Sequence, residues 1–285
     1  MMRIITISGD IGGGKSAVSK CLEATLGYAV IGTGAIQREI AKKRGVTTLE
    51  LNRLSITDPS IDEEIDGFVI ELGKSGGDII IDSRLAWNFI PQSFKAFLIV
   101  DPLVGARRVF GDQRAEEKNP TLEKTLDNNR QRRQLELERF KQLYDVDFRD
   151  FANYDTVIDT SYSPPATIAA KLAELYGVAL GQGSFPQAWA NAQRLAPTRK
   201  PPGRGQAEVT AIAESIRLHG FDYGQPIACE CVGDTLFIRD GHKRALAAQL
   251  EGLDLLPCTL QAGAEAGADG IEPAWRADWA AALGG

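Results

Sequence analysis

The chain has 285 residues, of which 44% are apolar and 25% are charged, a composition that allows one large hydrophobic core or two smaller ones. Its formal net charge of -6 gives no overall attraction to polyanions, so contact with nucleic acid requires local basic patches. The four cysteines show neither metal-ligand spacing nor the density of a disulfide scaffold, which indicates a reducing compartment. No apolar run approaches the roughly 20 residues that cross a bilayer, and no signal peptide precedes the first strand. We therefore expect a cytoplasmic protein without a membrane partner.

A strand followed by a glycine-rich loop opens the chain. Residues 3–8, RIITIS, are typical of a buried strand, and GDIGGGKS follows directly. This loop satisfies the pattern G-x-x-x-x-G-K-[ST], and the helix-like stretch after it ends on Gly27. Backbone N–H groups of such a loop surround phosphates, Lys15 reaches the β- and γ-phosphates, and Ser16 can ligate Mg²⁺. The pattern predicts binding of ATP or GTP; we expect ATP with Mg²⁺, held by Gly9, Asp10, Gly12, Gly13, Gly14, Lys15 and Ser16.

A second buried strand is predicted at Ile79–Ile81, with Asp82, Ser83 and Arg84 at its carboxyl end. Open α/β sheets place their ligand crevice at this edge. Asp82 could hold Mg²⁺ through water, accept the proton of an attacking hydroxyl, or merely cap the following turn. Arg84 suits a planar grip on an anionic or carbonyl-bearing acceptor.

From roughly residue 3 to residue 173 the chain resembles the cytidylate kinases of the archaeal type, on the stretches VIGTGAIQRE, IIIDSRLA and RRQLELERFKQLYDVDF. The resemblance implies a P-loop kinase with a parallel sheet flanked by helices. It implies that Thr33 and Arg38 contact the acceptor and that Arg84 contacts the nucleotide. It also implies that Arg132 and Arg139 of a lid helix contact the donor phosphates and act in catalysis with Lys15.

The sequence departs from that family around the acceptor. Asp82-Ser83-Arg84-Leu85-Ala86-Trp87 replaces the usual Glu-Gly-Arg-Leu-Ala-Gly, and Gln134 replaces a lid arginine. Trp87 is either a stacking platform for a base or a core aromatic residue. The glycine loop resembles that of deoxynucleoside kinases, which phosphorylate a hydroxyl with an acidic residue placed like Asp82. An alcohol acceptor benefits from such a base, whereas a phosphate acceptor mainly needs cations, so we expect an alcohol.

The composition changes after the first 176 residues, which we assign to the kinase domain. Residues 177–207 contain no acidic residue, and their basic residues lie in a Pro/Gly-rich run: Arg194, Arg199, Lys200 and Arg204. The range is predicted to be a linker, either a solvated one or an arm that contacts phosphates.

Residues 208–285 are predicted to form a smaller α+β domain. An amphipathic helix ends at Gly220, two strand-like runs follow, and a glycine-led turn enters the helix HKRALAAQLEG before a final strand. Over roughly residues 195–262 the pattern resembles the N-terminal domain of ParB proteins. That resemblance implies an anion site at the helix N-terminus, formed by Asp240, His242, Lys243 and Arg244. His242 is alternatively a surface residue or a local hydrogen-bonding group.

The two halves together suggest a kinase whose alcohol lies in DNA. The fusion resembles the bacteriophage kinases that phosphorylate the hydroxymethyl group of 5-hydroxymethyluracil in DNA, a step in thymine hypermodification, so the protein would act in the host cytoplasm on DNA containing a modified pyrimidine. The alternatives are a cytidylate kinase acting on CMP or dCMP, and a ParB-like protein whose DNA binding is switched by nucleotide. We assign catalysis to Lys15, Asp82, Arg132 and Arg139, metal binding to Ser16 and Asp82, and substrate binding to Thr33, Arg38, Arg84 and Trp87.

Overall fold

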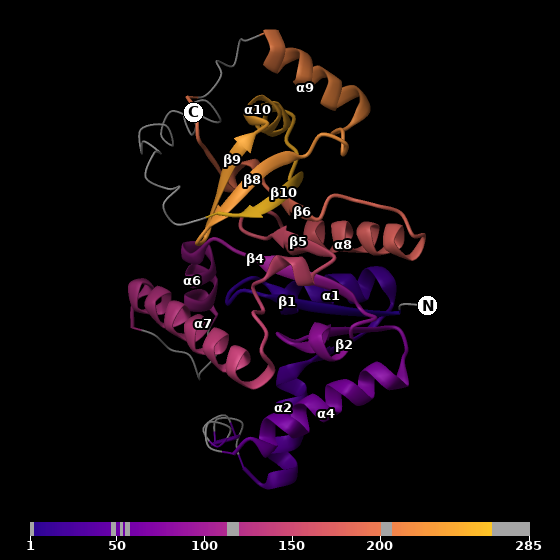
Figure 1. Cartoon of the computed structure of the whole chain (residues 1–285), viewed down its shortest axis with the longest axis vertical. Helices are drawn as coiled ribbons and strands as arrows, with labels where there is room; N and C mark the ends of the chain where they lie inside the picture. The colour runs from indigo at the N-terminus through magenta and orange to yellow at the C-terminus, as the bar shows by residue number, and fades with distance from the viewer. Residues whose placement is uncertain are drawn as a thin grey trace.

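A computed structural model describes residues 3–46, 50–51, 54, 58–112, 120–200 and 207–263. Within these ranges ten strands form one sheet in the order β2-β3-β1-β4-β5-β6-β10-β8-β9-β7. Figure 1 shows helices on both faces of its N-terminal part and the C-terminal strands continuing the sheet beyond β6. The predicted α/β class, with a mostly parallel sheet flanked by helices, is confirmed.

The N-terminal strands are all parallel to their neighbours. Isoleucine, valine and phenylalanine dominate them, because strands covered by helices on both faces must be apolar on both sides. The five strands are β1 (Ile4–Gly9), β2 (Ala29–Gly32), β3 (Ile79–Asp82), β4 (Phe94–Ile99) and β5 (Thr156–Asp159).

Helices connect these strands. The first helix packs on α8, α2 packs on α4, and α6 packs on the long polar helix α7 (Figure 1). The Thr121 side chain caps α7 by accepting a hydrogen bond from the backbone N–H of Lys124. The helices are α1 (Lys15–Leu26), α2 (Thr33–Arg44), α4 (Ser60–Ser75), α5 (Ala86–Phe89), α6 (Pro102–Gly111), α7 (Leu122–Tyr144) and α8 (Pro165–Leu180), with a 3₁₀ turn η1 at Phe151–Asn153.

The C-terminal part has the predicted order of helix, hairpin, helix and strand. Its helix α9 ends before Gly220, which has a positive φ of 78°. β6 continues the parallel sheet beside β5, while β10 runs antiparallel to β6. The elements are β6 (Ala188–Ala190), η2 (Ala192–Arg194), β7 (Leu195–Pro197), α9 (Ala207–His219), β8 (Ile227–Val232), β9 (Thr235–Asp240), α10 (His242–Leu250) and β10 (Leu256–Ala262).

The range 177–207, predicted to be a linker, contains the end of α8 and two strands of the sheet. Arg194 is only 9% exposed and forms an ion pair of 2.9 Å with Asp159, so its charge is neutralised inside the protein. This corrects its prediction as part of a solvated or phosphate-contacting arm. Arg199 and Lys200 are exposed, and Arg204 lies outside the described residues.

One buried apolar cluster joins the two halves of the chain. It contains Trp87, Phe97 and Tyr154 from the first half and Leu246 and Leu256 from the second. The two sides of the predicted linker therefore share one core cluster, and the division into domains at 176 and 207 stays a prediction. Among the described residues no helix is long and apolar enough to span a bilayer.

Candidate active site

The glycine-rich loop leads from β1 into α1. Gly9 has φ 149° and Gly12 has φ 76°, conformations that residues with a side chain rarely adopt. A Cβ atom on Gly9 would collide with the backbone of Leu98 in β4, and one on Gly12 with the backbone of Gly105 in α6. The two glycines therefore let the loop lie directly against its neighbours.

The loop lines a cleft of about 390 Å³. Lys15 lies in this cleft, and its Nζ donates to the backbone oxygen of Gly9 at 3.3 Å. Burial, together with the nearby Arg84 guanidinium, lowers the pKa of Lys15 to about 7. The cleft is lined by Ile11 to Ala17 and by Arg84, Arg108, Val109, Asp112 and Arg132. Cations from four different segments thus face one space, as binding of a polyphosphate requires.

Asp82 ends β3, at the carboxyl edge of the sheet as predicted, and lies beside the start of α1. The Ser16 hydroxyl donates to its Oδ2 at 2.9 Å, and the Thr33 hydroxyl donates to its backbone oxygen at 3.0 Å. A hydroxyl and a carboxylate this close form the hard oxygen donor set that Mg²⁺ prefers, with nucleotide phosphates and water as its other ligands. The described residues contain no group of three or more acidic, histidine or cysteine side chains that could hold a metal ion by themselves.

A carboxylate from α7 joins two of the predicted substrate arginines. Glu136 lies 2.6 Å from the Nε of Arg84 and 3.1 Å from the Nε of Arg132. Arg84 also donates to the backbone oxygen of Gly9. The structure therefore brings Arg84 and Arg132 together at the loop, with the Glu136 carboxylate between them.

Arg139 has another partner. It forms an ion pair with Asp62 of α4, and one turn along each helix the Tyr144 hydroxyl donates to Asp66 at 2.6 Å. These two contacts join α7 to α4. Arg139 is not among the residues that line the cleft, so in this conformation its predicted donor-phosphate contact is not made.

Trp87 is a core residue. It is 5% exposed, its Nε1 donates to the backbone oxygen of Arg84 at 3.0 Å, and its ring lies 5.2 Å from that of Tyr154. Of the two roles considered for Trp87, the structure therefore favours the core residue over the stacking platform, and its assignment to substrate binding is corrected. Arg38 is exposed on α2 near the predicted acceptor side.

Sequence reasoning missed Arg108. It reaches from α6 to the backbone oxygens of Gly12 and Thr160, at 3.2 and 2.6 Å, and lines the cleft. Burial lowers the pKa of its guanidinium. One signal was present: Arg108 comes one helical turn after Gly105, the residue of α6 that packs on the loop.

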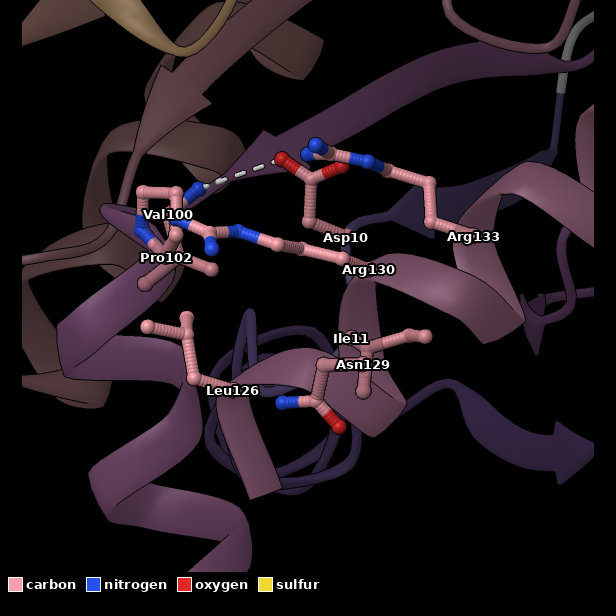
Figure 2. Close-up of a pocket in the computed structure, with 8 residues that line it drawn as sticks. All are labelled: Asp10, Ile11, Val100, Pro102, Leu126, Asn129, Arg130 and Arg133. Atoms are coloured by element: carbon pink, nitrogen blue, oxygen red, sulfur yellow. Dashed lines mark hydrogen bonds between the residues drawn. The ribbon is translucent and has the colours of Figure 1, made fainter. Parts of the chain in front are cut away.

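Asp10 faces away from the phosphate side of the loop. Its Oδ2 accepts from the backbone N–H of Val100 at 3.4 Å, and its Oδ1 lies 3.5 Å from Arg149. With Arg130 and Arg133 of α7 it lines a small cavity of about 20 Å³ (Figure 2). Asp10 therefore anchors the loop from behind, and its predicted role in nucleotide binding is confined to its backbone.

A model of the cytidylate kinase-like family matches residues 4–162, the segment that carries this cleft. The chain belongs to the cytidylate kinase-like family. The cytidylate kinase of Methanocella arvoryzae is 36% identical over 158 residues, which are 55% of this chain and 87% of that one. The cytidylate kinase of Methanothrix thermoacetophila is 35% identical over 60% of this chain and 97% of that one. Shikimate kinase from Bacteroides thetaiotaomicron has a TM-score of 0.47 and 18% identity, covering 62% of this chain and 99% of that chain.

As a member of this family the protein is an ATP-dependent phosphotransferase that uses Mg²⁺. The ion, bound to the donor phosphates, offsets charge on the transferring group. Within this kinase, Lys15, Arg84, Arg108 and Arg132 surround the space for the phosphates. The Ser16 hydroxyl would hold the ion, and the Asp82 carboxylate hydrogen-bonded to it lies where it could serve either as a second ligand or as a proton acceptor.

The kinase's C-terminal part carries the residues predicted to bind an anion. Lys243 is paired with Glu208, and Arg244 with Asp240 at 2.9 Å. His242 is 8% exposed, and its Nε2 accepts from the backbone N–H of Thr198 at 3.2 Å. Burial, together with Arg199, lowers its pKa to about 4. His242 is thus a buried hydrogen-bonding group that fastens the turn, which corrects its placement in an anion site.

Proposed function

We propose that this kinase transfers the γ-phosphate of ATP to the hydroxymethyl group of 5-hydroxymethyluracil in DNA. The proposal rests on one observation: the strands of the C-terminal part belong to the same sheet as the strands of the kinase segment. β6 lies between β5 and β10, so the family segment and the extra strands form one continuous sheet. A free mononucleotide needs no second structural unit for its binding, whereas a polymer has to be held on both sides of the reacting base.

The acceptor side of the cleft is compatible with an alcohol. Asp82 is a carboxylate at the mouth of the P-loop, next to Thr33. A neutral hydroxyl needs a group that accepts its proton during attack, and Asp82 is the acidic side chain joined directly to Ser16 in the loop. With Trp87 buried, a base leaving the DNA stack would have to be held by polar contacts instead. Arg38 is exposed, and Arg84 lines the cleft but would have to exchange Glu136 for the base.

A cytidylate kinase is the second candidate. The relatives reported above are named cytidylate kinase, and the family segment, residues 4–162, includes every residue that lines the cleft. Arg84 would then bind the phosphate of CMP or dCMP, for which no base is required. A nucleotide-switched DNA-binding protein without catalysis has less support, because a switch has no use for the arginines in the cleft.

The test supplies ATP labelled at the γ-phosphate with one acceptor at a time: CMP, dCMP, 5-hydroxymethyl-dUMP, and DNA with or without 5-hydroxymethyluracil. The proposal expects label only in the DNA that contains the modified base, and none with Lys15→Ala. Labelling of CMP or dCMP without labelling of DNA would assign the protein to the cytidylate kinases. Single-stranded and duplex DNA are offered separately, because extruding a base from a duplex costs energy that a single strand does not require.

A further inference from the structure

A tight turn of the C-terminal part reaches the kinase machinery. β8 and β9 are joined by Gly233 and Asp234 alone. Gly233 has φ 59° while Asp234 does not have a positive φ, the pattern of a type II′ hairpin turn. Such a turn fixes the direction of the Asp234 side chain, because the backbone on both sides is held in the sheet.

Asp234 is surrounded by three arginines, two of them from the kinase segment. Its two carboxylate oxygens accept from the two terminal nitrogens of Arg133 at 2.7 and 2.8 Å. Arg149 donates to it at 3.0 Å, and Arg194 donates to its backbone oxygen. The Asp234 side chain is 21% exposed and that of Arg149 is 16% exposed. Two parallel hydrogen bonds between a guanidinium and a carboxylate fix both distance and orientation, unlike a surface ion pair.

The partners of Asp234 touch the active site on two sides. Arg149 lies 3.5 Å from Asp10 and so connects the turn to the back of the P-loop. Arg133 directly follows Arg132 on α7, and Glu136 lies one turn further along. Arg132 lines the phosphate cleft and is paired with Glu136. Figure 2 shows Arg133 extending from α7 towards Asp10, and Arg130 extending towards Pro102. A carboxylate from the C-terminal part therefore lies between the P-loop and the helix that carries the cleft arginines.

We propose that Asp234 is a positioning residue for phosphoryl transfer, holding α7 at the distance from the P-loop at which Arg132 and Glu136 reach the cleft. The C-terminal part is then a component of the kinase, whichever acceptor is used. Misplacement of a catalytic group by about 1 Å can cost about a hundredfold in rate, so loss of this support should reduce turnover.

The charges around Asp234 agree with this role. Burial raises the pKa of its carboxyl, but Arg133 and Arg149 outweigh burial and hold the pKa below its ordinary value. Asp234 is therefore charged at neutral pH. Without its charge, Arg133 and Arg149 would face each other in a partly buried place with only Asp10 near Arg149, so α7 would move away.

The experiment measures ATP hydrolysis and acceptor phosphorylation by the full chain and four variants: Asp234→Asn, Asp234→Glu, Arg133→Gln and the double variant Asp234→Asn/Arg133→Gln. Hydrolysis uses water as acceptor, so its result does not depend on the proposed substrate. Asp222→Asn is the matched control, because Asp222 lies exposed in another turn of the C-terminal part and caps only that turn. Thermal unfolding of each variant is measured in parallel.

We expect Asp234→Asn and Arg133→Gln each to lower kcat by about tenfold with little change in KM for ATP, and the double variant to be no slower than either. Asp234→Glu should recover part of the loss, and Asp222→Asn should match the wild type. The proposal is overturned if Asp234→Asn keeps kcat within about twofold, if the two losses multiply, or if the loss equals the fraction of unfolded protein.

Discussion

The hydroxyl of Ser16 donates a 2.9 Å hydrogen bond to the carboxylate of Asp82, joining the first turn of α1 to the end of β3. Both side chains are oxygen donors, and they lie at the edge of the sheet where P-loop kinases bind their metal-nucleotide. The contact gives Asp82 two possible duties, to hold Mg²⁺ or to accept a proton. These duties predict different responses to the same substitution.

Asp82→Asn keeps the shape of the side chain and removes its charge. If Asp82 accepts the proton of an alcohol, the rate should fall by roughly 10² to 10⁴ at every Mg²⁺ concentration, with little change in ATP affinity. If Asp82 holds Mg²⁺, the variant should bind the metal-nucleotide more weakly and regain activity as Mg²⁺ is raised. Steady-state kinetics over a Mg²⁺ titration separates the two. We expect the first result; a variant that phosphorylates CMP as fast as the wild type would contradict it.

Binding of ATP at pH 8 should be accompanied by uptake of up to about one proton. The pKa of Lys15 is about 7, so the amine is mostly neutral at pH 8, and phosphates beside it would favour the charged form. Calorimetric titrations in buffers of different ionisation enthalpy measure this uptake. Lys20→Ala, on the exposed side of α1, should leave the uptake unchanged. A binding enthalpy independent of the buffer would refute the prediction, and Lys15→Ala should abolish both uptake and phosphoryl transfer.

Glu136→Gln should increase the affinity for inorganic pyrophosphate by severalfold. The Glu136 carboxylate pairs with Arg84 and Arg132, and phosphate oxygens have to compete with it for these cations. The neutral amide competes less well. Calorimetry or protection against thermal unfolding reports the affinity. Glu138→Gln, an exposed neighbour paired with Gln134, is the control and should bind pyrophosphate like the wild type. Weaker binding by Glu136→Gln would show instead that the carboxylate orients the arginines for phosphate.

The protein should lose stability as the pH falls below about 6.5, and His242 should cause part of that loss. The folded-state pKa of His242 is about 4, below the 6.5 of an exposed histidine, so between these values the unfolded chain binds more protons. The contribution of His242 to the free energy of unfolding is therefore complete above pH 6.5 and declines towards pH 4. His242→Gln, which can still accept from Thr198, should flatten the melting temperature between pH 7.5 and 5. His219→Gln, at an exposed position, should keep the wild-type slope.

Local sequence patterns predicted the phosphate-binding half well. The strand, glycine loop and helix around Lys15 are present, and Asp82 lies at the predicted carboxyl end of its strand, where the structure brings it next to Ser16. Placing Thr33 and Arg84 at the same edge followed from the family resemblance. These features depend on short segments whose chemistry specifies one conformation.

The remaining errors come from tertiary packing. Arg132, Arg133 and Arg139 look equivalent in sequence, and only the rotation of α7 directs them to the cleft, to Asp234 and to Asp62. Aspartate is common in tight turns, so the turn alone accounts for Asp234. Nothing in the sequence therefore predicts its hydrogen bond to Arg133, 101 positions away. The sequence is compatible with Trp87 either as a stacking platform for a base or as a core residue, and the structure places it in the apolar cluster shared by both halves.

The sheet shared by the two halves of the chain affects how the enzyme folds during its synthesis. β6 pairs on one side with β5 and on the other with β10, the last strand described. The partner of Arg133, Asp234, is 101 residues further along the chain. During synthesis the nucleotide loop and its parallel strands emerge first, but such distant contacts close late because each requires a long loop to be ordered. A ribosome-bound chain that ends before β8 would thus have a complete P-loop but would lack Asp234, the partner of Arg133 and Arg149. If Asp234 positions α7 as proposed, full activity should appear only after the C-terminal strands have left the ribosome and folded onto β6.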